Sequence, residues 1–342
     1  MKKTLIYLTG LLIATYSVKS QDHHLSHYDM ASIYLNPAAT GMYEQENNDG
    51  KLYLDHRSQW NSLGIKPYLT SYLAYDKPCV LSDKNMGFGF FIINNNNGIG
   101  NFNKLTFMAS GAYDIISPRN SSGSKNHLLS VGIQLGLFYR SANPNSLSYD
   151  VQYTEANNGG FDKNIPSNEN YVSYNITRFD AGYGLYYRNL DKARKAHPYA
   201  GFAMSHLTRP DESFYGAATR LPFKISAYGG VDIKVNEKMD LTPRVLYMSQ
   251  ARASEFTAGM LFDYLVSEND VKVVAGIDYR VKDACILSIG LKQPYYYTAR
   301  FSYDINTSGL NKYSNGRGAY ELSMSYVIRS QKKRAIISEH RY

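Results

Sequence analysis

The sequence predicts an all-β protein, a closed antiparallel transmembrane β-barrel of about 14 strands. Strands that alternate apolar and polar residues, a large number of tyrosines and an apolar N-terminal segment support this prediction. Tyr accounts for 32 of the 342 residues, against 14 Phe and one Trp. Each phenol buried in a soluble core would need a hydrogen-bond partner, whereas barrel girdles hold the ring in the interface and the hydroxyl in water. A soluble β-sandwich with a Tyr-rich face is the less favoured alternative.

The alternation is clearest between residues 271 and 305. Every second residue of its strands is apolar or aromatic, and the residues between them include full charges, as at Asp278 and Arg280. Side chains alternate faces along a strand, so one face is suited to lipid and the other to a wet lumen. The lumen-facing candidates that we identify in this way are Lys272, Asp278, Arg280, Arg300, Asp304 and Glu321.

Strands of this kind recur along the chain, and their even number suits a closed antiparallel barrel with both chain ends on one side. Counts of 12 and 16 are the neighbouring alternatives. The predicted strands are 51–57, 69–76, 86–93, 104–116, 127–140, 178–188, 198–207, 221–235, 241–249, 255–265, 271–281, 285–292, 295–305 and 320–328.

The connectors differ in length. Segments 235–241 and 281–285 are short, so we expect both on the periplasmic side, where outer-membrane barrels have tight turns. The longer connectors are rich in Asn, Ser, Gly and Asp, and we expect them to face outward; they are 94–103, 141–177, 208–220 and 306–319. The asparagine run before Gly98 predicts a solvated loop. The longest connector exceeds the usual loop length, which indicates a functional or mobile segment.

The two ends of the chain differ from the strands. Residues 1–20 predict an export signal, because Lys2 and Lys3 precede an apolar stretch that ends in small residues. No later apolar run reaches the roughly 18 residues of a spanning helix. We therefore expect a barrel in a bacterial outer membrane. Its segments would be a periplasmic or barrel-mouth segment at 21–50, the barrel at 51–328 and a basic tail at 329–342. The tail is either solvated or bound to an acidic periplasmic partner.

Residues that could support catalysis or bind a metal form no recognised pattern. The chain has no P-loop, no HExxH, no CxxC and no GxSxG motif. His23, His24 and His27 are clustered, but no set of Cys or Asp/Glu residues accompanies them, and a chain terminus is a poor zinc cage. Cys79 and Cys285 lack a spacing signature, and we expect them to be unpaired. These observations predict neither enzyme activity nor a cofactor or metal; the lumen charges would pair across neighbouring strands.

The motifs along the chain are similar to those of one known family. They are YLNPAATG at 34–41, RSQW at 57–60, HLTRP at 206–210, LTP at 241–243, GIDYR at 276–280 and FSYD at 301–304. Their order and spacing resemble the PorP/SprF-like outer-membrane proteins of Bacteroidetes, components of the type IX secretion and gliding system. The likeness covers nearly the whole chain after residue 20. One departure is GAYE at 318–321, where the family often has a histidine before the glutamate.

The resemblance implies a non-enzymatic role. Such a barrel would support export or surface attachment of a large secreted adhesin with a type IX sorting domain, and would contact a periplasmic lipoprotein or other secretion components. Outer-membrane lipid is the remaining partner. Nucleic acid is not expected, because the formal net charge of +8 is spread along the chain without a basic stripe. The alternative function is a general or solute-specific outer-membrane channel.

Overall fold

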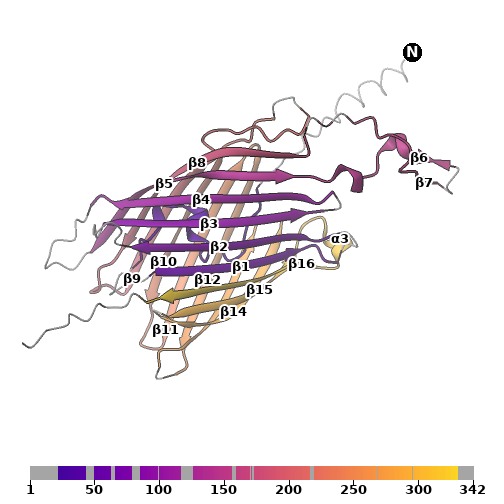
Figure 1. Cartoon of the computed structure of the whole chain (residues 1–342). Coiled ribbons are helices and arrows are strands. Elements are labelled where there is room, and N and C mark those ends of the chain that lie inside the picture. Colours follow the sequence, from indigo (N-terminus) through magenta and orange to yellow (C-terminus); the bar gives the residue numbers. More distant parts are fainter. Residues whose placement is uncertain are drawn as a thin grey trace, which may run out of the picture.

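The computed structural model describes residues 22–43, 50–62, 66–78, 85–98, 100–116, 126–155, 159–169, 171, 173–215, 219–267, 269–294 and 296–329. The signal prediction, Cys79 and the tail beyond Arg329 lie outside these residues. In the described chain, antiparallel strands form a closed barrel in which β1 pairs with both β2 and β16 (Figure 1). The prediction of a closed all-β barrel is confirmed.

The wall contains 14 strands within the described residues, and each overlaps one predicted strand. The wall strands are β1 Gly50–Gln59, β2 Tyr68–Pro78, β3 Met86–Asn97, β4 Phe102–Asp114, β5 His127–Ser141, β8 Asn175–Asn189, β9 Ala196–Ser205, β10 Lys224–Lys234, β11 Met239–Gln250, β12 Ala253–Leu265, β13 Lys272–Arg280, β14 Ala284–Gln293, β15 Tyr297–Asn306 and β16 Arg317–Ile328. A separate hairpin pairs β6 Tyr153–Thr154 with β7 Gly160–Phe161.

Helices are short. The helix α2 Ser32–Leu35 and the 3₁₀ turn η1 Pro37–Ala39 precede the wall, and α3 Asn311–Ser314 lies between β15 and β16. The 3₁₀ turns Pro144–Ser146 and Asp150–Gln152 lie between β5 and β6. Among the residues that the structure describes, no helix is long and apolar enough to cross a membrane.

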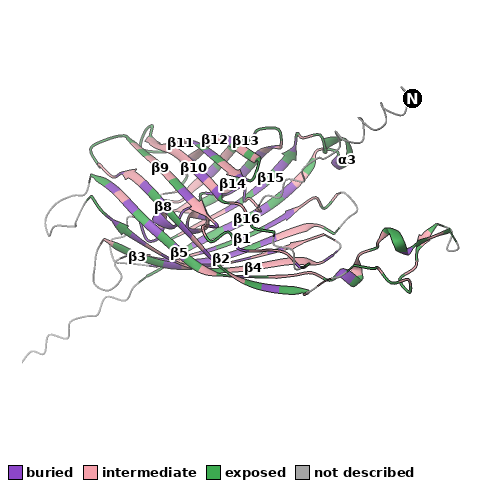
Figure 2. Ribbon diagram, turned by 90° about the horizontal axis from the view of Figure 1, so that it is seen from above, coloured by how far each residue is buried: buried purple, intermediate pink, exposed green. Residues whose placement is uncertain are grey.

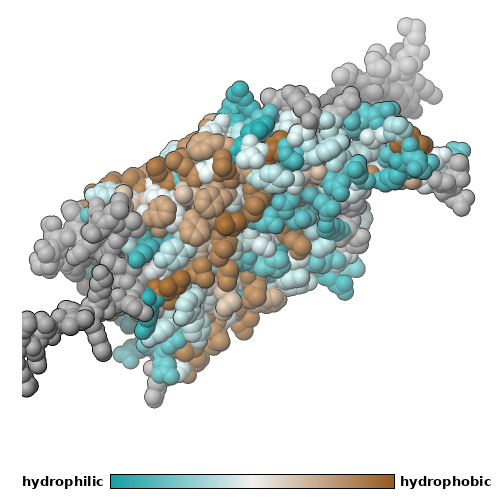
Figure 3. All heavy atoms as spheres, viewed as in Figure 1, coloured by the Kyte–Doolittle hydropathy of each residue, from teal (hydrophilic) through white to brown (hydrophobic). Residues whose placement is uncertain are grey.

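The wall has one apolar and one polar face. On β13 the side chains of Ile277 and Tyr279 are each 48% exposed, while Asp278 and Arg280 are 1% and 2% exposed. Figure 2 shows the same alternation of exposed and buried residues along the strands. The outward side chains gather in an apolar band across the wall (Figure 3). This band suits the hydrocarbon of the outer membrane, and the inward face forms the lumen.

The two ends of the barrel can be assigned from the topology. Gly50 at the start of β1 pairs with Ile328 at the end of β16, so both wall termini lie at one end. The opposite end carries the long connectors 142–174, 206–223 and 307–316. Because external loops are long in outer-membrane barrels, this loop end faces outward and the strand-terminus end faces the periplasm.

The prediction for the turn at 281–285 was wrong. Antiparallel strands turn at alternate ends of the barrel, and three strands, β11 to β13, separate this turn from the one after β10. The two short turns therefore lie at opposite ends, and the turn at 281–283 is at the loop end. Length alone does not determine the side of a turn.

The asparagine run at 94–97 is a strand and not a loop. It extends β3 and pairs residue by residue with the start of β4, from Asn94 with Leu105 to Asn97 with Phe102. Asn95 is 6% exposed and donates to Thr70 Oγ1 at 3.3 Å. Cross-strand pairing and a lumen partner outweigh the turn preference of Asn here.

The lumen contains residues 22–43, which we name the plug. The sequence leaves open whether segment 21–50 is periplasmic or at the barrel mouth, and the structure places these residues inside the wall. Leu25, Ala31 and Ile33 pack with Tyr53 and Phe91 of the wall in one buried cluster. A second cluster joins the Ala38 and Met42 side chains to wall residues of β4, β5 and β8. The plug thus has its own apolar contacts with the wall.

The turn η1 shows why this segment is not a strand. Asn36 accepts a hydrogen bond from the Ala38 N–H at 2.9 Å, and Pro37 occupies the first position of the turn. Both features favour the start of a helical turn. Gly132 of β5 leaves space for this turn, because a Cβ there would lie 2.4 Å from Ala38 N.

Candidate functional site in the barrel lumen

The plug runs through the lumen from the loop end towards the strand-terminus end. Near the loop end, the Asp22 N–H donates to Gln250 Oε1 at the end of β11, at 2.6 Å. Near the other end, the Gly41 N–H donates to Asp76 Oδ2 of β2 at 2.7 Å. Three groups of side chains, each joining charged wall residues to residues of the plug, hold the segment in place.

The first group, which we name the clamp, consists of Ser26, Arg57, Arg280, Asp304 and Glu321. All five residues are at most 2% exposed. The Arg57 guanidinium lies 2.8 Å from the Asp304 carboxylate and 3.1 Å from that of Glu321. The Ser26 hydroxyl accepts from Arg57 at 2.6 Å and from Arg280 at 3.1 Å, and it donates to Asp304 at 2.9 Å.

The plug backbone completes the clamp. The Ser26 and His27 N–H groups donate to the two Glu321 carboxylate oxygens at 2.7 and 2.6 Å. Glu321 therefore binds two consecutive peptide groups as well as Arg57. A buried carboxylate needs such partners, because without them it would be left as an uncompensated charge.

The second group holds Asp29. Its carboxylate accepts from Arg244 Nη1 at 2.7 Å and from Arg300 Nη2 at 2.6 Å. Arg244 also pairs with Asp278 at 2.6 Å. Burial alone would raise the pKa of Asp29, but Arg300 and Arg244 outweigh it and hold the pKa well below the usual value. The plug thus supplies an anion where the wall has two arginines.

The third group, which we name the outer latch, lies at the loop end and consists of Asp22, Lys104, Asp180, His206 and Glu212. The two His206 ring nitrogens lie 2.5 Å from the carboxylates of Asp180 and Asp22. Lys104 lies 3.2 Å from Asp22 and 3.0 Å from Glu212. Burial lowers the pKa of His206, but the two carboxylates outweigh it and raise the pKa to about 9. A protonated imidazole therefore bridges plug and wall at neutral pH.

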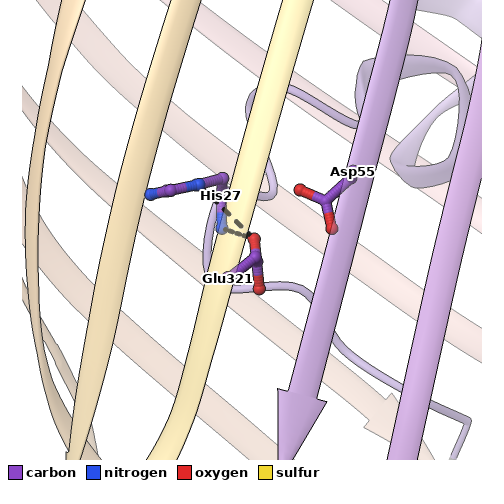
Figure 4. Close-up of side chains that lie close together, drawn as sticks. All are labelled: His27, Asp55 and Glu321. Carbon is purple, nitrogen blue, oxygen red and sulfur yellow. Dashed lines mark hydrogen bonds and ion pairs between the residues drawn. The ribbon is translucent and has the colours of Figure 1, made fainter.

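Three buried side chains of metal-ligand type lie close together in this region: His27, Asp55 and Glu321 (Figure 4). Their contacts fit a hydrogen-bonded cluster better than a metal site. Glu321 already accepts from Arg57 and from two backbone N–H groups, Asp55 accepts from Ser323, and the His27 imidazole is directed away from Asp55. The cationic Arg57, which lies 3.1 Å from Glu321, also opposes a bound cation.

The structure brings most of the predicted lumen residues together around the plug. Arg280, Asp304 and Glu321 are in the clamp, and Asp278 and Arg300 belong to the group around Asp29. Lys272 lies apart, near the strand-terminus end, where it pairs with Asp240 of β11.

The expected pairing across neighbouring strands holds only in part. Arg57 of β1 does pair with Glu321 of β16, but its contact with Asp304 reaches β15 and skips a strand. Arg244 of β11 likewise reaches Asp278 on β13. A small neighbour allows this, because a Cβ at Gly259 of β12 would meet the Asp278 carboxylate at 2.2 Å.

The sequence reasoning did not single out Arg57, Arg244 and the plug residues Ser26 and Asp29 as site residues. Arg57 lies in the RSQW motif and shares the inward phase of its strand with Asp55, so the strand period could have identified it. The plug residues follow no strand period, and nothing local in the sequence predicts their partners.

Comparison with known proteins supports a family assignment. A family model described as "Type IX secretion system membrane protein PorP/SprF" matches residues 17–326. A search of curated proteins found no match.

Solved structures show a similar barrel. The toluene transporter TbuX of Ralstonia pickettii has a TM-score of 0.50 and 11% identity, covering 88% of this chain and 94% of that one. The toluene transporter TodX of Pseudomonas putida has a TM-score of 0.49 and 12% identity, covering 90% and 95%. At such identity the likeness to TbuX shows the fold alone.

Proposed function

This chain belongs to the PorP/SprF family of type IX secretion system membrane proteins, and we propose that it supports export or surface attachment of one large secreted adhesin with a type IX sorting domain. The protein is an outer-membrane barrel, and its family consists of secretion components. In this role it would also contact a periplasmic lipoprotein or other parts of the secretion machinery.

The plug is the observation on which the proposal chiefly depends. A channel for free diffusion needs an open lumen, whereas this lumen holds residues 22–43 in buried contacts along their length. Before this path opened, Glu321 would have to lose its buried hydrogen bonds from the Ser26 and His27 N–H groups, and Asp29 its ion pairs with Arg244 and Arg300. A barrel whose lumen is filled by a plug is better suited to hold partners at its two ends than to conduct solutes.

The connector between β5 and β8 provides a surface for a secreted partner. It carries the β6–β7 hairpin away from the wall at the loop end (Figure 1). Tyr153, Phe161, Tyr174 and the nearby Tyr215 are each 48% to 55% exposed. Tyr153 packs against Phe161, and Tyr174 and Tyr215 both pack against Tyr171. Groups of exposed aromatic side chains are typical of protein-binding surfaces, because they bury a large area at a small entropic cost. We name these four residues the aromatic arm.

Gene deletion tests the proposal. The expected result is loss of surface display of one adhesin while other type IX substrates are secreted normally. Unchanged display of every adhesin would contradict the proposed function.

A variant of the aromatic arm locates the contact. Tyr153→Ser combined with Phe161→Ser should reduce adhesin display, whereas Tyr313→Ser should not. Tyr313 is 75% exposed in α3, on a different connector at the same end, so it controls for simple loss of a surface aromatic.

Planar bilayers distinguish the channel alternative. The purified full-length barrel should show no steady current, because the plug occupies the lumen. A steady single-channel current in the wild-type protein would favour a channel instead.

A further inference from the structure

Two cavities lie between the plug and the wall towards the strand-terminus end of the lumen. They are at the opposite end of the barrel from the aromatic arm and have no part in its proposed role. One has a volume of about 310 Å³ and lies against Tyr28, Asp29 and Tyr43 of the plug. The other has a volume of about 520 Å³ and is lined by the ends of β8, β10, β14 and β16 and the start of β15. Tyr43, Lys51 and Arg188 line both, so the two cavities adjoin each other towards the strand-terminus end. We name the larger cavity the vestibule.

The described residues that line the vestibule carry an excess of positive charge. Among the described residues, no carboxylate lines it. Its cationic side chains are Lys51, Arg188, Lys192, Arg194, Lys234 and Lys292.

Three of these six cations have carboxylate partners outside the lining. Arg188 pairs with Asp232 at 2.7 Å, and Lys292 pairs with Asp263 at 2.6 Å. Arg194 pairs with its neighbour Asp191 at 3.3 Å.

The other three have no ion pair within the part of the chain that the structure describes. Lys51 lies on the lumen face of β1, with its amino group 5.0 Å from the centre of the Tyr53 ring. Lys192 and Lys234 lie at the exposed rim, on the connector after β8 and at the end of β10. Unpaired cations around one cavity raise its positive potential, and this attracts an anionic partner.

The chain's own tail does not supply that anion. β16 ends at this mouth, and the residues beyond Arg329 include Lys332, Lys333, Arg334 and Arg341 against a single Glu339. The sequence of the tail therefore carries an excess of positive charge and is a poor match for the vestibule cations. Lipid headgroups are also a poor match, because Lys51, Arg188 and Lys292 point into the lumen and not to the lipid face.

We propose that the vestibule binds an extended acidic polypeptide segment of a periplasmic partner. Its cations are distributed around the mouth on β1, β8, β10, β14 and the connector after β8, and do not converge on one point. This distribution fits a chain of carboxylates better than a single small anion. The tyrosines Tyr43, Tyr296 and Tyr297 add flat surfaces and hydroxyls for the peptide backbone. The space is bounded by the plug, so the segment enters from the periplasm and ends there.

Peptide binding to the full-length barrel in non-ionic detergent tests this proposal. A fluorescent oligoglutamate peptide should bind, with an affinity that falls as salt is added, and an oligoglutamine peptide of equal length should not. The double variant Lys192→Glu/Lys234→Glu should weaken oligoglutamate binding at least about tenfold, since two attractive contacts become repulsive. Lys51→Met probes the inner part and should weaken binding by a smaller factor.

The matched control is Lys282→Glu/Lys312→Glu, which reverses two exposed charges at the opposite end of the barrel. It should leave oligoglutamate affinity unchanged. Equal loss in both double variants, or equal binding of oligoglutamine, would overturn the proposal. Complete displacement of the peptide by millimolar inorganic phosphate would also overturn it, in favour of a small-anion site.

The identity of the partner rests on the proposed secretion function, but the two can fail separately. If gene deletion leaves adhesin display unchanged and oligoglutamate still binds, the secretion role is wrong and the vestibule assignment stands. If deletion abolishes display and oligoglutamate does not bind, only the vestibule assignment is wrong.

Discussion

The clamp and the vestibule both contain several charged side chains in the lumen, but those of the clamp are paired and several of those in the vestibule are not. In the clamp, Arg57 and Arg280 meet the carboxylates of Asp304 and Glu321, and all four are at most 2% exposed. In the vestibule, Lys192 and Lys234 remain exposed and have no ion pair among the described residues. The plug separates the two regions.

The difference follows from access to water. A charge removed from water costs several kcal/mol unless a partner compensates it, so the closed region must be balanced. A charge that keeps its hydration can stay unpaired at little cost and is available to a partner. The charges of the clamp, which holds the plug, are therefore paired. The excess positive charge of the described vestibule residues is available to an anionic partner.

Removing a clamp cation should have the largest effect on stability. Arg57→Met leaves Glu321 without its arginine and Asp304 with only Arg280, which should cost about 3–5 kcal/mol in the free energy of unfolding. Urea unfolding in detergent micelles measures this loss, and bilayer conductance shows whether the plug has left the lumen. Arg194→Met at the vestibule rim is the control and should have little effect, because this ion pair is largely exposed. Equal losses would remove the distinction between the regions.

Crowding the plug against the wall should have the next largest effect. A Cβ added by Gly132→Ala would lie 2.4 Å from Ala38 N and 2.5 Å from Pro37 C, so the plug must shift. We expect a loss of about 1–3 kcal/mol in the same unfolding measurement. Gly111→Ala on β4 is the matched control, because its nearest new contact is 3.9 Å away. If neither Gly132→Ala nor Gly111→Ala changed the free energy of unfolding, the plug would not pack on β5.

The outer latch should depend on pH. Its His206 pKa of about 9 lies above the value of 6.5 expected in the unfolded chain. The protonated imidazole therefore contributes its full stabilisation below pH 6.5 and loses it as the pH rises through about 9. NMR titration of the His206 ring in micelles should give the raised pKa directly, and Asp22→Asn should lower it. A ring that titrates near 6.5 would show that the latch is open.

Loss of the latch should destabilise the protein less than loss of the clamp. His206→Gln keeps hydrogen bonding but removes the charge, and we expect a cost of about 1–2 kcal/mol at pH 7. His56→Gln serves as the control, because His56 lies on the exposed face of β1. Unfolding at pH 7 and again above pH 9 should show the difference between the variants shrinking as His206 loses its proton.

The smallest effect on stability is expected at the vestibule. Lys192→Glu should leave the unfolding free energy unchanged, because the side chain is exposed and unpaired. The same substitution should weaken oligoglutamate binding. A measurable loss of stability without a change in binding would make Lys192 a structural residue and contradict the comparison.

Local patterns in the sequence were sufficient for the wall. A strand exposes alternate residues to lipid and lumen, so the sequence of Val273, Ala275 and Ile277 against Asp278 and Arg280 predicted both the strand and the inward charges. Two predictions were wrong because a contact or constraint from distant parts of the chain outweighed the local preference of the residues. Asn94–Asn97 has turn-forming residues but also partners on β4, and the side of the turn at 281–283 depends on how many strands precede it.

By itself, the sequence predicted a barrel of about 14 strands and the inward face of most charged residues, because these depend on the period of the chain and on its solvent. Only the tertiary structure decided that residues 22–43 occupy the lumen and that Ser26 and Asp29 meet Arg57 and Arg244. It also decided that Lys51, Lys192 and Lys234 at one mouth have no ion pair among the described residues. Such contacts join residues more than 200 positions apart in several cases, as between Asp29 and Arg300. They depend on closure of the barrel around the segment, and no local pattern encodes that.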